Sequence, residues 1–249
     1  MQFYKKFSPE VNITVGEERA MAIPQIVDKI PATEIILLDD AFQHRSVIPT
    51  LNILLTDYNR LFYTDYMLPV GRLRENRRGA KRANLVIVSK CPSDLTNASK
   101  KIISEKIIKY CKPGTNIFFT GIHYGKPIPF SNENFAYKES GGEMADELLL
   151  VSAIAQPKNF EKQLEVAFKI YDHVIYNDHH QYMQKDIEKI KASFLKSKAK
   201  SILTTEKDFV KLSTLDTSGL PFFYLPIEVY FLEEEEKFQE IIMKLFENA

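Results

Sequence analysis

The chain has few of the features that mark secreted, membrane-spanning or nucleic-acid-binding proteins. Its two cysteines, Cys91 and Cys111, have no metal-ligand spacing and predict a reducing compartment without a disulfide framework. No apolar run approaches the roughly 18 residues that a membrane span needs, and the first residues do not form the apolar region of a signal peptide. The formal net charge is zero. We therefore expect no nucleic-acid partner, and an anionic ligand would need a local basic patch.

What the sequence does contain is a series of short apolar runs that alternate with helical patterns. The runs are rich in Val, Ile, Leu and Phe and lack in/out alternation, which is typical of strands covered on both faces. We therefore expect an α/β fold with a largely parallel sheet and helices on both faces. The expected strands are VNITV (11–15), EIILL (34–38), NILLT (52–56), NLVIVS (84–89), NIFFTGI (116–122), LLLVSAIA (148–155), HVIY (173–176), SILTT (201–205) and PFFYLP (221–226). The expected helices cover about residues 17–29, 94–110, 159–170, 184–198, 206–212 and 233–247.

A stretch that mixes Gly, Pro, Ser, Asn and charged residues interrupts this alternation at residues 123–147. Such a composition is typical of a connection or a hairpin, so we expect two α/β lobes. The predicted lobes are residues 1–125 and residues 126–249. The charge run LEEEEKFQ near the end of the chain is best explained as the solvated start of a helix.

The segment EIILLDDAFQHR places two carboxylates, Asp39 and Asp40, directly after an apolar run. Ligands of parallel α/β sheets bind at the carboxyl ends of the strands, where such carboxylates can hold Mg2+ directly or through water. Gln43 and His44 follow within a turn and would support the site. The alternative is that the Asp pair caps a helix, and the residues alone leave the two interpretations about even.

The segment LPVGRLRENRRGAKRANLVIVSK concentrates basic side chains in a chain of zero net charge. Arginine forks bind phosphates bidentately, so Arg72, Arg74, Arg77 and Arg78 are candidate ligands of an anion. The aromatic residues just upstream would suit an acylated phosphosugar, and they would suit ordinary packing equally well. A solvated basic helix face is the alternative interpretation of the arginines.

Two segments in the second half, VIYNDHHQY and SILTTEKDFVKL, place polar residues after an apolar run. Histidine can relay a proton near neutral pH and a carboxylate can fix its tautomer, which makes His179 and Asp178 candidates for proton handling. Thr205 and Lys207 could contact a nucleotide at the start of a helix. A metal site or a polar turn at the histidines, and a capping box at Thr205, remain open from the residues alone.

Taken together, six segments resemble those of the tetraacyldisaccharide 4'-kinase family of lipid A biosynthesis: DDAFQHR, LPVGRLRE, KRANLVIVSK, AIAQPKNF, DHHQY and ILTTEKDFVKL. They occur in the family's order over about residues 35–212, and six in order are more specific than any one of them. The resemblance implies a P-loop-NTPase-like fold. It also implies ATP- and Mg2+-dependent phosphorylation of the 4'-hydroxyl of a tetraacylated disaccharide 1-phosphate. The implied location is peripheral, on the cytoplasmic face of the bacterial inner membrane.

The resemblance also has consequences for individual positions. His179 resembles the catalytic-dyad histidine of the family, with Asp178 and His180 in support. The family usually has Gly where Ala41 stands, and it has a Walker A loop, G-x-x-x-x-G-K-[ST], which occurs nowhere in this sequence. That loop supplies the phosphate cradle and a metal-ligating hydroxyl. We therefore expect an N-terminal portion of the kinase to be missing and the chain as given to be inactive.

Two functions of other classes compete with the kinase. Asp-His-His also marks a class of metal-dependent phosphoesterases, but those enzymes usually need an upstream D-x-D, which this sequence lacks. A non-catalytic anion-binding module could instead be built on the arginine-rich segment. Walker A codons in frame upstream of Met1 would separate a miscalled start from a genuine truncation of the kinase.

Overall fold

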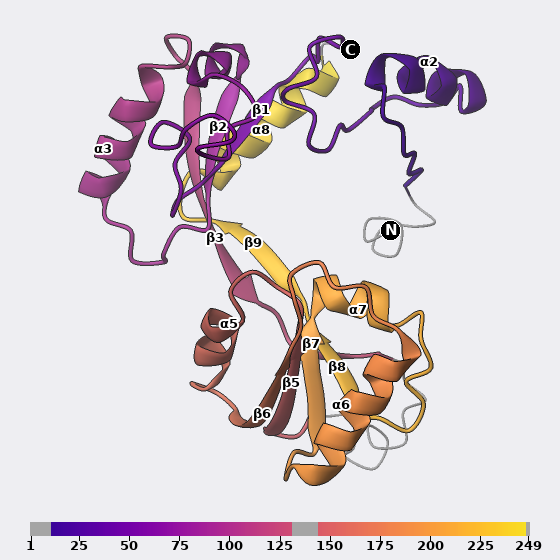
Figure 1. The fold of residues 1–249 in the computed structure, drawn as a ribbon. Helices are drawn as coiled ribbons and strands as arrows, with labels where there is room; N and C mark the ends of the chain where they lie inside the picture. Colours follow the sequence, from indigo (N-terminus) through magenta and orange to yellow (C-terminus); the bar gives the residue numbers. More distant parts are fainter. Residues whose placement is uncertain (1–10, 131–143, 248–249) are drawn as a thin grey trace. The chain divides into compact units, whose positions relative to one another are not determined.

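The computed structural model describes residues 11–130 and 144–247. The chain divides into two compact units, which are described separately below (Figure 1). Unit 1 is built mainly from Tyr124–Glu228, and unit 2 from Thr14–His123 together with Val229–Ala249. The expected second lobe, residues 126–249, therefore differs from unit 1 at its C-terminal end. Part of the Pro- and Gly-rich connection expected at residues 123–147 lies outside the described residues.

Unit 2 contains a four-stranded sheet in the order β1-β2-β3-β9. Its strands are β1 (Ile53–Asp57), β2 (Leu85–Ser89), β3 (Asn116–Tyr124) and β9 (Ile227–Phe231). The first three are parallel, with Ile53 opposite Leu85 and Leu85 opposite Asn116. Strand β9 was not predicted from the sequence. Just beyond it the backbone N–H of Leu232 donates to the carbonyl oxygen of Phe119 at 2.9 Å, which returns the C-terminal segment to this unit.

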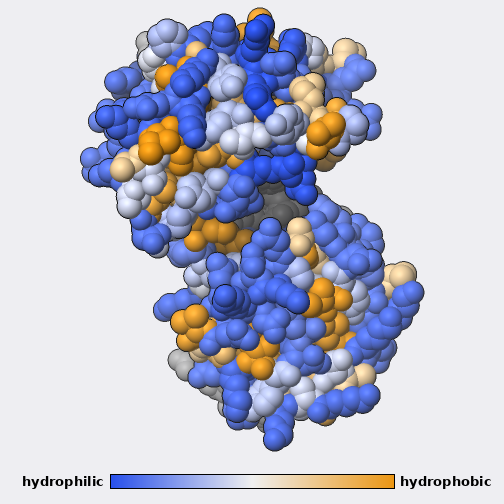
Figure 2. Space-filling model, turned by 60° about the vertical axis from the view of Figure 1, so that its left-hand side comes forward, coloured by the Kyte–Doolittle hydropathy of each residue, from blue (hydrophilic) through white to orange (hydrophobic). Residues whose placement is uncertain are grey.

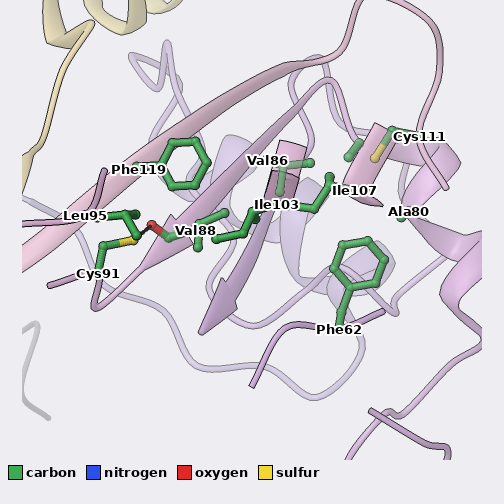
Figure 3. Packing of buried hydrophobic residues seen from close by; sticks show 11 residues of the cluster. Phe62, Ala80, Val86, Val88, Cys91, Leu95, Ile103, Ile107, Cys111 and Phe119 are labelled. Atoms are coloured by element: carbon green, nitrogen blue, oxygen red, sulfur yellow. Dashed lines mark hydrogen bonds between the residues drawn. The ribbon is translucent and has the colours of Figure 1, made fainter. Parts of the chain in front are cut away.

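The main core of unit 2 lies between its sheet and helix α3 (Asn97–Ile108). Thr96 caps the start of the helix, because its side chain accepts a hydrogen bond from the N–H of Ser99. Ile103 and Ile107, four residues apart on the helix, pack in the cluster that holds alternate residues of β2 (Figure 3). Helix and strand periodicities therefore bring these apolar side chains to facing surfaces.

Helix α8 (Glu235–Glu247) packs against the other face of the same sheet. Phe119 belongs to the α3 cluster, so its neighbour Phe118 points to the opposite face. There the ring of Phe118 meets Phe238 edge-to-face with the ring centroids 5.4 Å apart. A short 3-10 helix, Arg77–Arg82, precedes β2, and Asn76 caps it by accepting a hydrogen bond from the N–H of Arg78.

Unit 1 contains a five-stranded sheet in the order β4-β8-β7-β5-β6. Neighbouring strands are parallel except at the edge, where β4 pairs antiparallel with β8. The strands are β4 (Ile128–Pro129), β5 (Glu147–Ser152), β6 (Lys169–Ile175), β7 (Ser201–Thr205) and β8 (Phe222–Leu225). The helices are α5 (Pro157–Leu164), α6 (Gln184–Lys196) and α7 (Glu206–Leu212). The expected α/β fold with parallel strands is confirmed.

Both faces of the unit 1 sheet are covered, which explains the unbroken apolar runs in its central strands. Leu149 and Val151 belong to the core cluster of α6 residues Ile187 and Ile190. The alternate residues of β5, such as Leu150, belong to a second cluster with residues of α5. Successive side chains of a strand point to opposite faces, so a strand between two helical layers must be apolar at every position.

Two expected strands are wrong, at residues 11–15 and 34–38, where the structure has no regular strand. The apolar side chains there reach solvent, and Leu37 is 90% exposed. An apolar run becomes a strand only when neighbouring strands take up its backbone groups, and no described segment pairs with either run. Helix α2 (Arg19–Lys29) forms as predicted between them, but none of its residues is buried.

Apolar side chains also reach the surface elsewhere in the molecule. On the face seen in Figure 2 they form several patches between hydrophilic side chains. In β1 the side chain of Leu55 is 66% exposed, although β1 belongs to a sheet. In unit 1, by contrast, all five residues of β7 are buried.

Candidate functional site

The polar loops of unit 1 meet at the carboxyl ends of strands β6 and β7. Both strands run parallel to β5, so the segments that follow them emerge at the same edge of the sheet. The loop after β6 carries Asp178 and His179, and the first turn of α7 carries Lys207. The ammonium of Lys207 lies 2.8 Å from Asp178 Oδ1, and His179 Nε2 lies 3.8 Å from Asp178 Oδ2. Three predicted site residues are therefore together.

His179 is the most accessible member of this group. Its side chain is 78% exposed, and its φ of 63° lies in the left-handed region that residues other than glycine seldom adopt. The hydrogen bond from Lys207 is the main reason that the pKa of Asp178 is lowered, and His179 adds a smaller contribution. An ionised carboxylate therefore lies beside the exposed imidazole of His179.

His180, the next residue, has a different environment. Its Nε2 lies 3.0 Å from Oδ2 of Asp186, and its ring stacks on Tyr176 with the centroids 4.6 Å apart. Asp186 is buried at the start of α6, where it also accepts a hydrogen bond from the N–H of Met183. Burial alone would raise the pKa of Asp186, but these bonds together lower it. His180 therefore supports the loop from inside and leaves His179 to face solvent.

Thr205 and Asp208 form the cap of helix α7. The hydroxyl of Thr205 lies 2.8 Å from Asp208 Oδ2, and it accepts a hydrogen bond from the N–H of Asp208 at 3.2 Å. The capping interpretation of Thr205 accounts for these contacts, and its role in nucleotide binding stays a prediction. The fully buried Asp208 also accepts a hydrogen bond from the N–H of Ala153 at 3.0 Å. This carboxylate ties the loop after β5 to the loop after β7, a connection that capping patterns do not reveal.

A hydrogen-bonded chain of serine, histidine and glutamate also lies in unit 1. Ser152 Oγ is 2.8 Å from His173 Nε2, and His173 Nδ1 is 3.0 Å from Glu161 Oε2. The order of groups is that of a nucleophile triad. Ser152 is completely buried, however, so its hydroxyl cannot meet a substrate in this structure. The chain of bonds instead holds helix α5 against strands β5 and β6.

In unit 2 the segment DDAFQHR docks on the arginine-rich segment. Asp40 Oδ2 lies 2.7 Å from the guanidinium of Arg74. Arg82 donates to the carbonyl oxygen of Phe42 at 2.8 Å, and its guanidinium lies over the Phe42 ring, 4.8 Å from the centroid. Glu75 adds two further ion pairs, with Arg82 at 2.7 Å and Arg45 at 3.1 Å. Two motifs that are far apart in the sequence therefore form one surface.

The four predicted anion-binding arginines divide into two pairs. Arg74 is engaged by Asp40, and Arg77 donates to the backbone carbonyl of Asp65. The side chains of Arg72 and Arg78 have no hydrogen-bond or ion-pair partner among residues 11–130 and 144–247. A pocket of about 340 Å3 lies beside Arg78, and its lining also includes Asn76, Arg77, Tyr66, Met67 and Tyr110.

Asp39 and Asp40 supply the kind of oxygen ligands that Mg2+ prefers. Both side chains are exposed, and Asp40 takes a left-handed φ of 46°. The side chain of Gln43 donates to the backbone carbonyl of Asp40 at 3.1 Å, so it stabilises the turn, and His44 donates its N–H to the carbonyl of Ala41. No group of three metal-ligating side chains occurs in the described part of the chain. Arg74 already engages the Asp40 carboxylate, and the binding of Mg2+ by Asp39 and Asp40 stays a prediction.

One further charged pair of unit 2 was missed from the sequence. Asp57 and Lys90 stand at the carboxyl ends of β1 and β2, and Lys90 Nζ lies 2.7 Å from Asp57 Oδ2. Burial would raise the pKa of Asp57, but the hydrogen bonds of Lys90 and Asn59 outweigh it and the pKa is lowered. The signal was present in the sequence, because NILLTD and NLVIVSK both end an apolar run with a charge.

Comparison with known proteins identifies the family of the chain. The family model described as tetraacyldisaccharide-1-P 4'-kinase matches residues 3–247. The chain belongs to this kinase family. A tetraacyldisaccharide 4'-kinase of Flavobacterium psychrophilum is 43% identical over 249 residues, all of this chain and 69% of that protein. One of Bacteroides thetaiotaomicron is 40% identical, over all of this chain and 69% of that protein.

A solved structure of the same kinase family has a similar fold. The crystal structure of LpxK from Aquifex aeolicus in complex with ATP matches with a TM-score of 0.62 and 23% identity, over 93% of this chain and 64% of that chain. The family resemblance and the α/β architecture predicted from the sequence are thus confirmed. The chain spans about two thirds of the length of these members of the tetraacyldisaccharide 4'-kinase family. Among the described residues, no helix has the length and apolar character to cross a membrane.

Proposed function

We propose that this chain takes part in the ATP-dependent phosphorylation of the 4'-hydroxyl of a tetraacyldisaccharide 1-phosphate, the reaction of lipid A biosynthesis that its family's name describes. The observation that carries the proposal is the group formed by Asp178, His179 and Lys207 at the carboxyl edge of the unit 1 sheet. The family match over residues 3–247 supplies the reaction class.

His179 is the proton-handling residue in this proposal. An exposed imidazole can take the proton of the attacking hydroxyl, and the ionised carboxylate of Asp178 lies beside this ring. Lys207 is the candidate contact for nucleotide phosphates, since its ammonium is held at the same edge by Asp178. An incoming phosphate would compete with the Asp178 carboxylate for this ammonium.

Unit 2 supplies the anion-binding groups in this proposal. Arg72 and Arg78 are the arginines that would meet a substrate phosphate, whereas Arg74 and Arg77 hold the protein's own structure. Asp39 would hold Mg2+ together with nucleotide phosphates, and Asp40 would join it by exchanging its Arg74 partner for the ion. The ion would neutralise charge on the transferring group when bound. Gln43 would keep the Asp40 turn in place through the bond to its backbone.

The lipid substrate places the reaction at a membrane surface. We accordingly propose a peripheral position on the cytoplasmic face of the inner membrane, with no nucleic acid involved. The phosphoesterase alternative is not favoured, because the sequence has no D-x-D and the described residues gather no three-ligand metal group. A purely anion-binding module would leave the exposed Asp178–His179–Lys207 group without a role.

The test is a kinetic comparison in a kinase completed with the family's Walker A region. Replacing His179 by Ala or Gln should lower kcat by about 100-fold to 10,000-fold and remove the acid limb of the pH–rate profile. The matched control is Gln181→Ala, because Gln181 is an exposed residue of the same loop. Equal kcat in the His179 and Gln181 variants would return His179 to the role of a solvated turn residue.

A further inference from the structure

A rigid loop of unit 2 exposes consecutive apolar side chains. Tyr66, Met67, Leu68 and Val70 are all exposed, and Val70 is 82% exposed. We propose that this tip, residues 66–70, is a docking element that inserts into the surface of a bilayer containing anionic lipids. The choice of a bilayer as partner rests on the proposed function, because the substrate of that reaction is a lipid.

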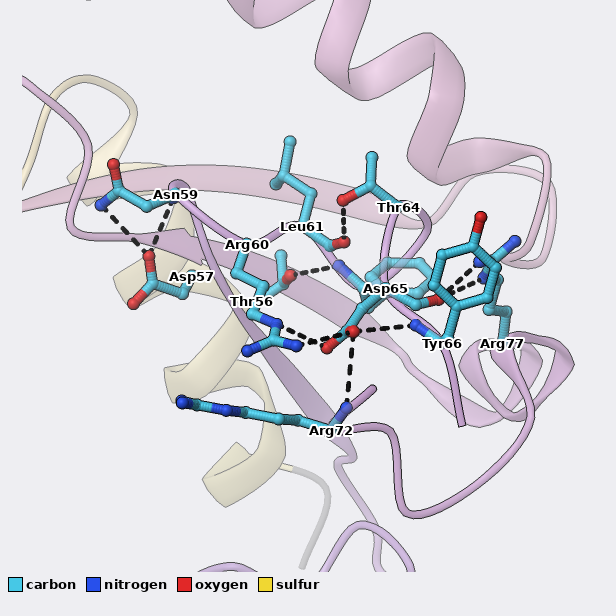
Figure 4. A network of polar contacts seen from close by, with 11 residues as sticks. Thr56, Asp57, Asn59, Arg60, Leu61, Thr64, Asp65, Tyr66, Arg72 and Arg77 are labelled. Carbon is cyan, nitrogen blue, oxygen red and sulfur yellow. Dashed lines mark hydrogen bonds and ion pairs between the residues drawn. The ribbon is translucent and has the colours of Figure 1, made fainter. Parts of the chain in front are cut away.

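The base of the loop is fixed, so the tip cannot fold back onto the protein. Asp65 is buried and receives two bonds from the guanidinium of Arg60, at 2.8 and 3.0 Å (Figure 4). Its Oδ1 also accepts the backbone N–H of Tyr66 at 2.8 Å and, more weakly, that of Arg72 at 3.4 Å. One buried carboxylate thus joins the two ends of the loop, and charge-assisted bonds of this kind are strong.

The backbone of the loop is closed on itself as well. Leu68 donates its N–H to the carbonyl of Leu73 and Leu73 donates to Tyr66, both at 3.0 Å. Gly71 sits against the carbonyl oxygen of Tyr66, where a Cβ atom would collide with the backbone. The exposure of Leu68 and Val70 is therefore built into the fold, and exposed apolar groups on a fixed support mark interaction surfaces.

The charge around the tip identifies the kind of partner. Residues 58–82 contain seven basic and two acidic side chains, in a protein whose net charge is zero. Both acidic side chains, Asp65 and Glu75, are paired with arginines of the protein itself. Arg72 and Arg78 keep their charge without a partner in the described residues. An apolar tip with a positive surround matches the interface of an anionic bilayer.

The other large group of exposed apolar residues has the opposite charge character. Val15, Met21, Ile35 and Leu37 are exposed in residues 11–40. That segment has six acidic and two basic side chains, so an anionic surface repels it. Charge therefore selects the 66–70 tip over the longer segment as the membrane-facing element.

The absence of tryptophan from the chain allows a direct test. Val70→Trp introduces a single indole at the tip, and Val166→Trp places one at a comparably exposed position of unit 1, where Val166 is 90% exposed. Each 249-residue variant is mixed with vesicles of phosphatidylcholine alone or with phosphatidylglycerol. We expect a blue shift and quenching by brominated lipid for Val70→Trp only, on phosphatidylglycerol vesicles, and a loss of both at high salt.

A second pair of variants measures the contribution of the tip to binding. Leu68→Ser with Val70→Ser should lower vesicle binding in sedimentation about tenfold. The control pair, Leu195→Ser with Val166→Ser, changes exposed apolar residues of unit 1 and should leave binding unchanged. Equal fluorescence shifts for both indoles would overturn the proposal. A Val70→Trp shift that depends on protein concentration in the absence of lipid would also overturn it and would indicate self-association instead.

No ATP or tetraacyldisaccharide is present in these measurements. A failure of the docking proposal would therefore leave the kinase proposal to its own kinetic test. Conversely, vesicle binding by the tip together with equal kcat in the His179 and Gln181 variants would support the docking proposal and contradict the role of His179 in the kinase proposal.

Discussion

The two units differ in how fully their apolar strands are covered by neighbouring strands and helices. In unit 1 the central strands have neighbours on both sides and helices on both faces, and every residue of β7 is buried. In unit 2 the edge strand β1 leaves Leu55 exposed, and the apolar run at 34–38 pairs with no strand among the described residues. The difference teaches that an apolar run specifies a parallel strand only when its partners are present, and an uncovered apolar edge favours association.

The largest expected effect concerns catalysis by the chain as given. Its sequence contains no Walker A motif, so the phosphate cradle that positions the transferring group is missing from these 249 residues. We expect no phosphorylated product from pure protein, ATP, Mg2+ and tetraacyldisaccharide 1-phosphate. Product above the level seen with heat-denatured protein would show that the units form a phosphate site by another route.

A second effect separates the metal site of unit 2 from the proton-handling site of unit 1. In the completed kinase, Asp39→Asn should lower activity about 10- to 100-fold, because a carboxylate near the metal is lost. The matched control is Asp28→Asn, which removes an exposed carboxylate from helix α2. Turnover close to wild type at saturating Mg2+ would assign Asp39 to the local turn instead.

A third prediction compares the two sheets by stability. Leu150 is completely buried in β5, so Leu150→Ala should reduce the free energy of unfolding of unit 1 by about 2–5 kcal/mol. The same change at Leu55, on the edge strand of unit 2, should alter the free energy of unfolding by less than about 0.5 kcal/mol. Urea unfolding followed separately in each unit measures both. Equal losses would indicate that the β1 edge is covered in solution.

A smaller effect is expected from acid. The pKa of Asp186 is lower in the folded protein than its unfolded value of 3.8, so its charge stabilises the fold above that value. This stabilisation is lost as the pH falls through the folded pKa. Asp186→Asn should therefore flatten the decline of the free energy of unfolding between about pH 5 and pH 2. An unchanged slope would mean that other carboxylates determine it.

The smallest effect is expected at the charged pair of β1 and β2. Lys90→Met should cost less than about 1 kcal/mol, because both partners remain partly exposed and water screens the attraction. Lys81→Met, at an exposed basic residue of the short helix before β2, provides the baseline. A difference between the two variants that persists at high salt would contradict a purely electrostatic origin.

The sequence allowed the central strands and most helices to be predicted, because burial on both faces leaves a continuous apolar run. Helix α7 lies where its pattern placed it, at residues 206–212. Strand β9 was missed because IEVYF directly follows another strand and carries a charge. The strand predicted at 34–38 was wrong because a clear apolar pattern does not show whether neighbouring strands are present, and none of the described segments pairs with this run.

The candidate sites were predictable to a lesser degree. The approach of Asp178, His179 and Lys207 follows from two parallel strands ending at one edge. The different environments of His179 and His180 do not follow, because they depend on a left-handed backbone angle and on a buried carboxylate six residues ahead. Likewise, composition could not tell which arginines are engaged by Asp40 and Asp65 and which remain available.

The pairing of β3 with β9 makes unit 1 an insert within unit 2. The chain leaves unit 2 at the end of β3 and re-enters it along β9, and these strands are neighbours in one sheet. On the unit 1 side, Gly125 donates its N–H to the carbonyl oxygen of Pro226 at 2.9 Å, so the two ends of the insert are also adjacent. A segment whose ends meet can be exchanged as a cassette with little disturbance of its host. The Asp178–His179–Lys207 group of unit 1 can thus be replaced or evolve separately from the sheet of unit 2 that carries the insert.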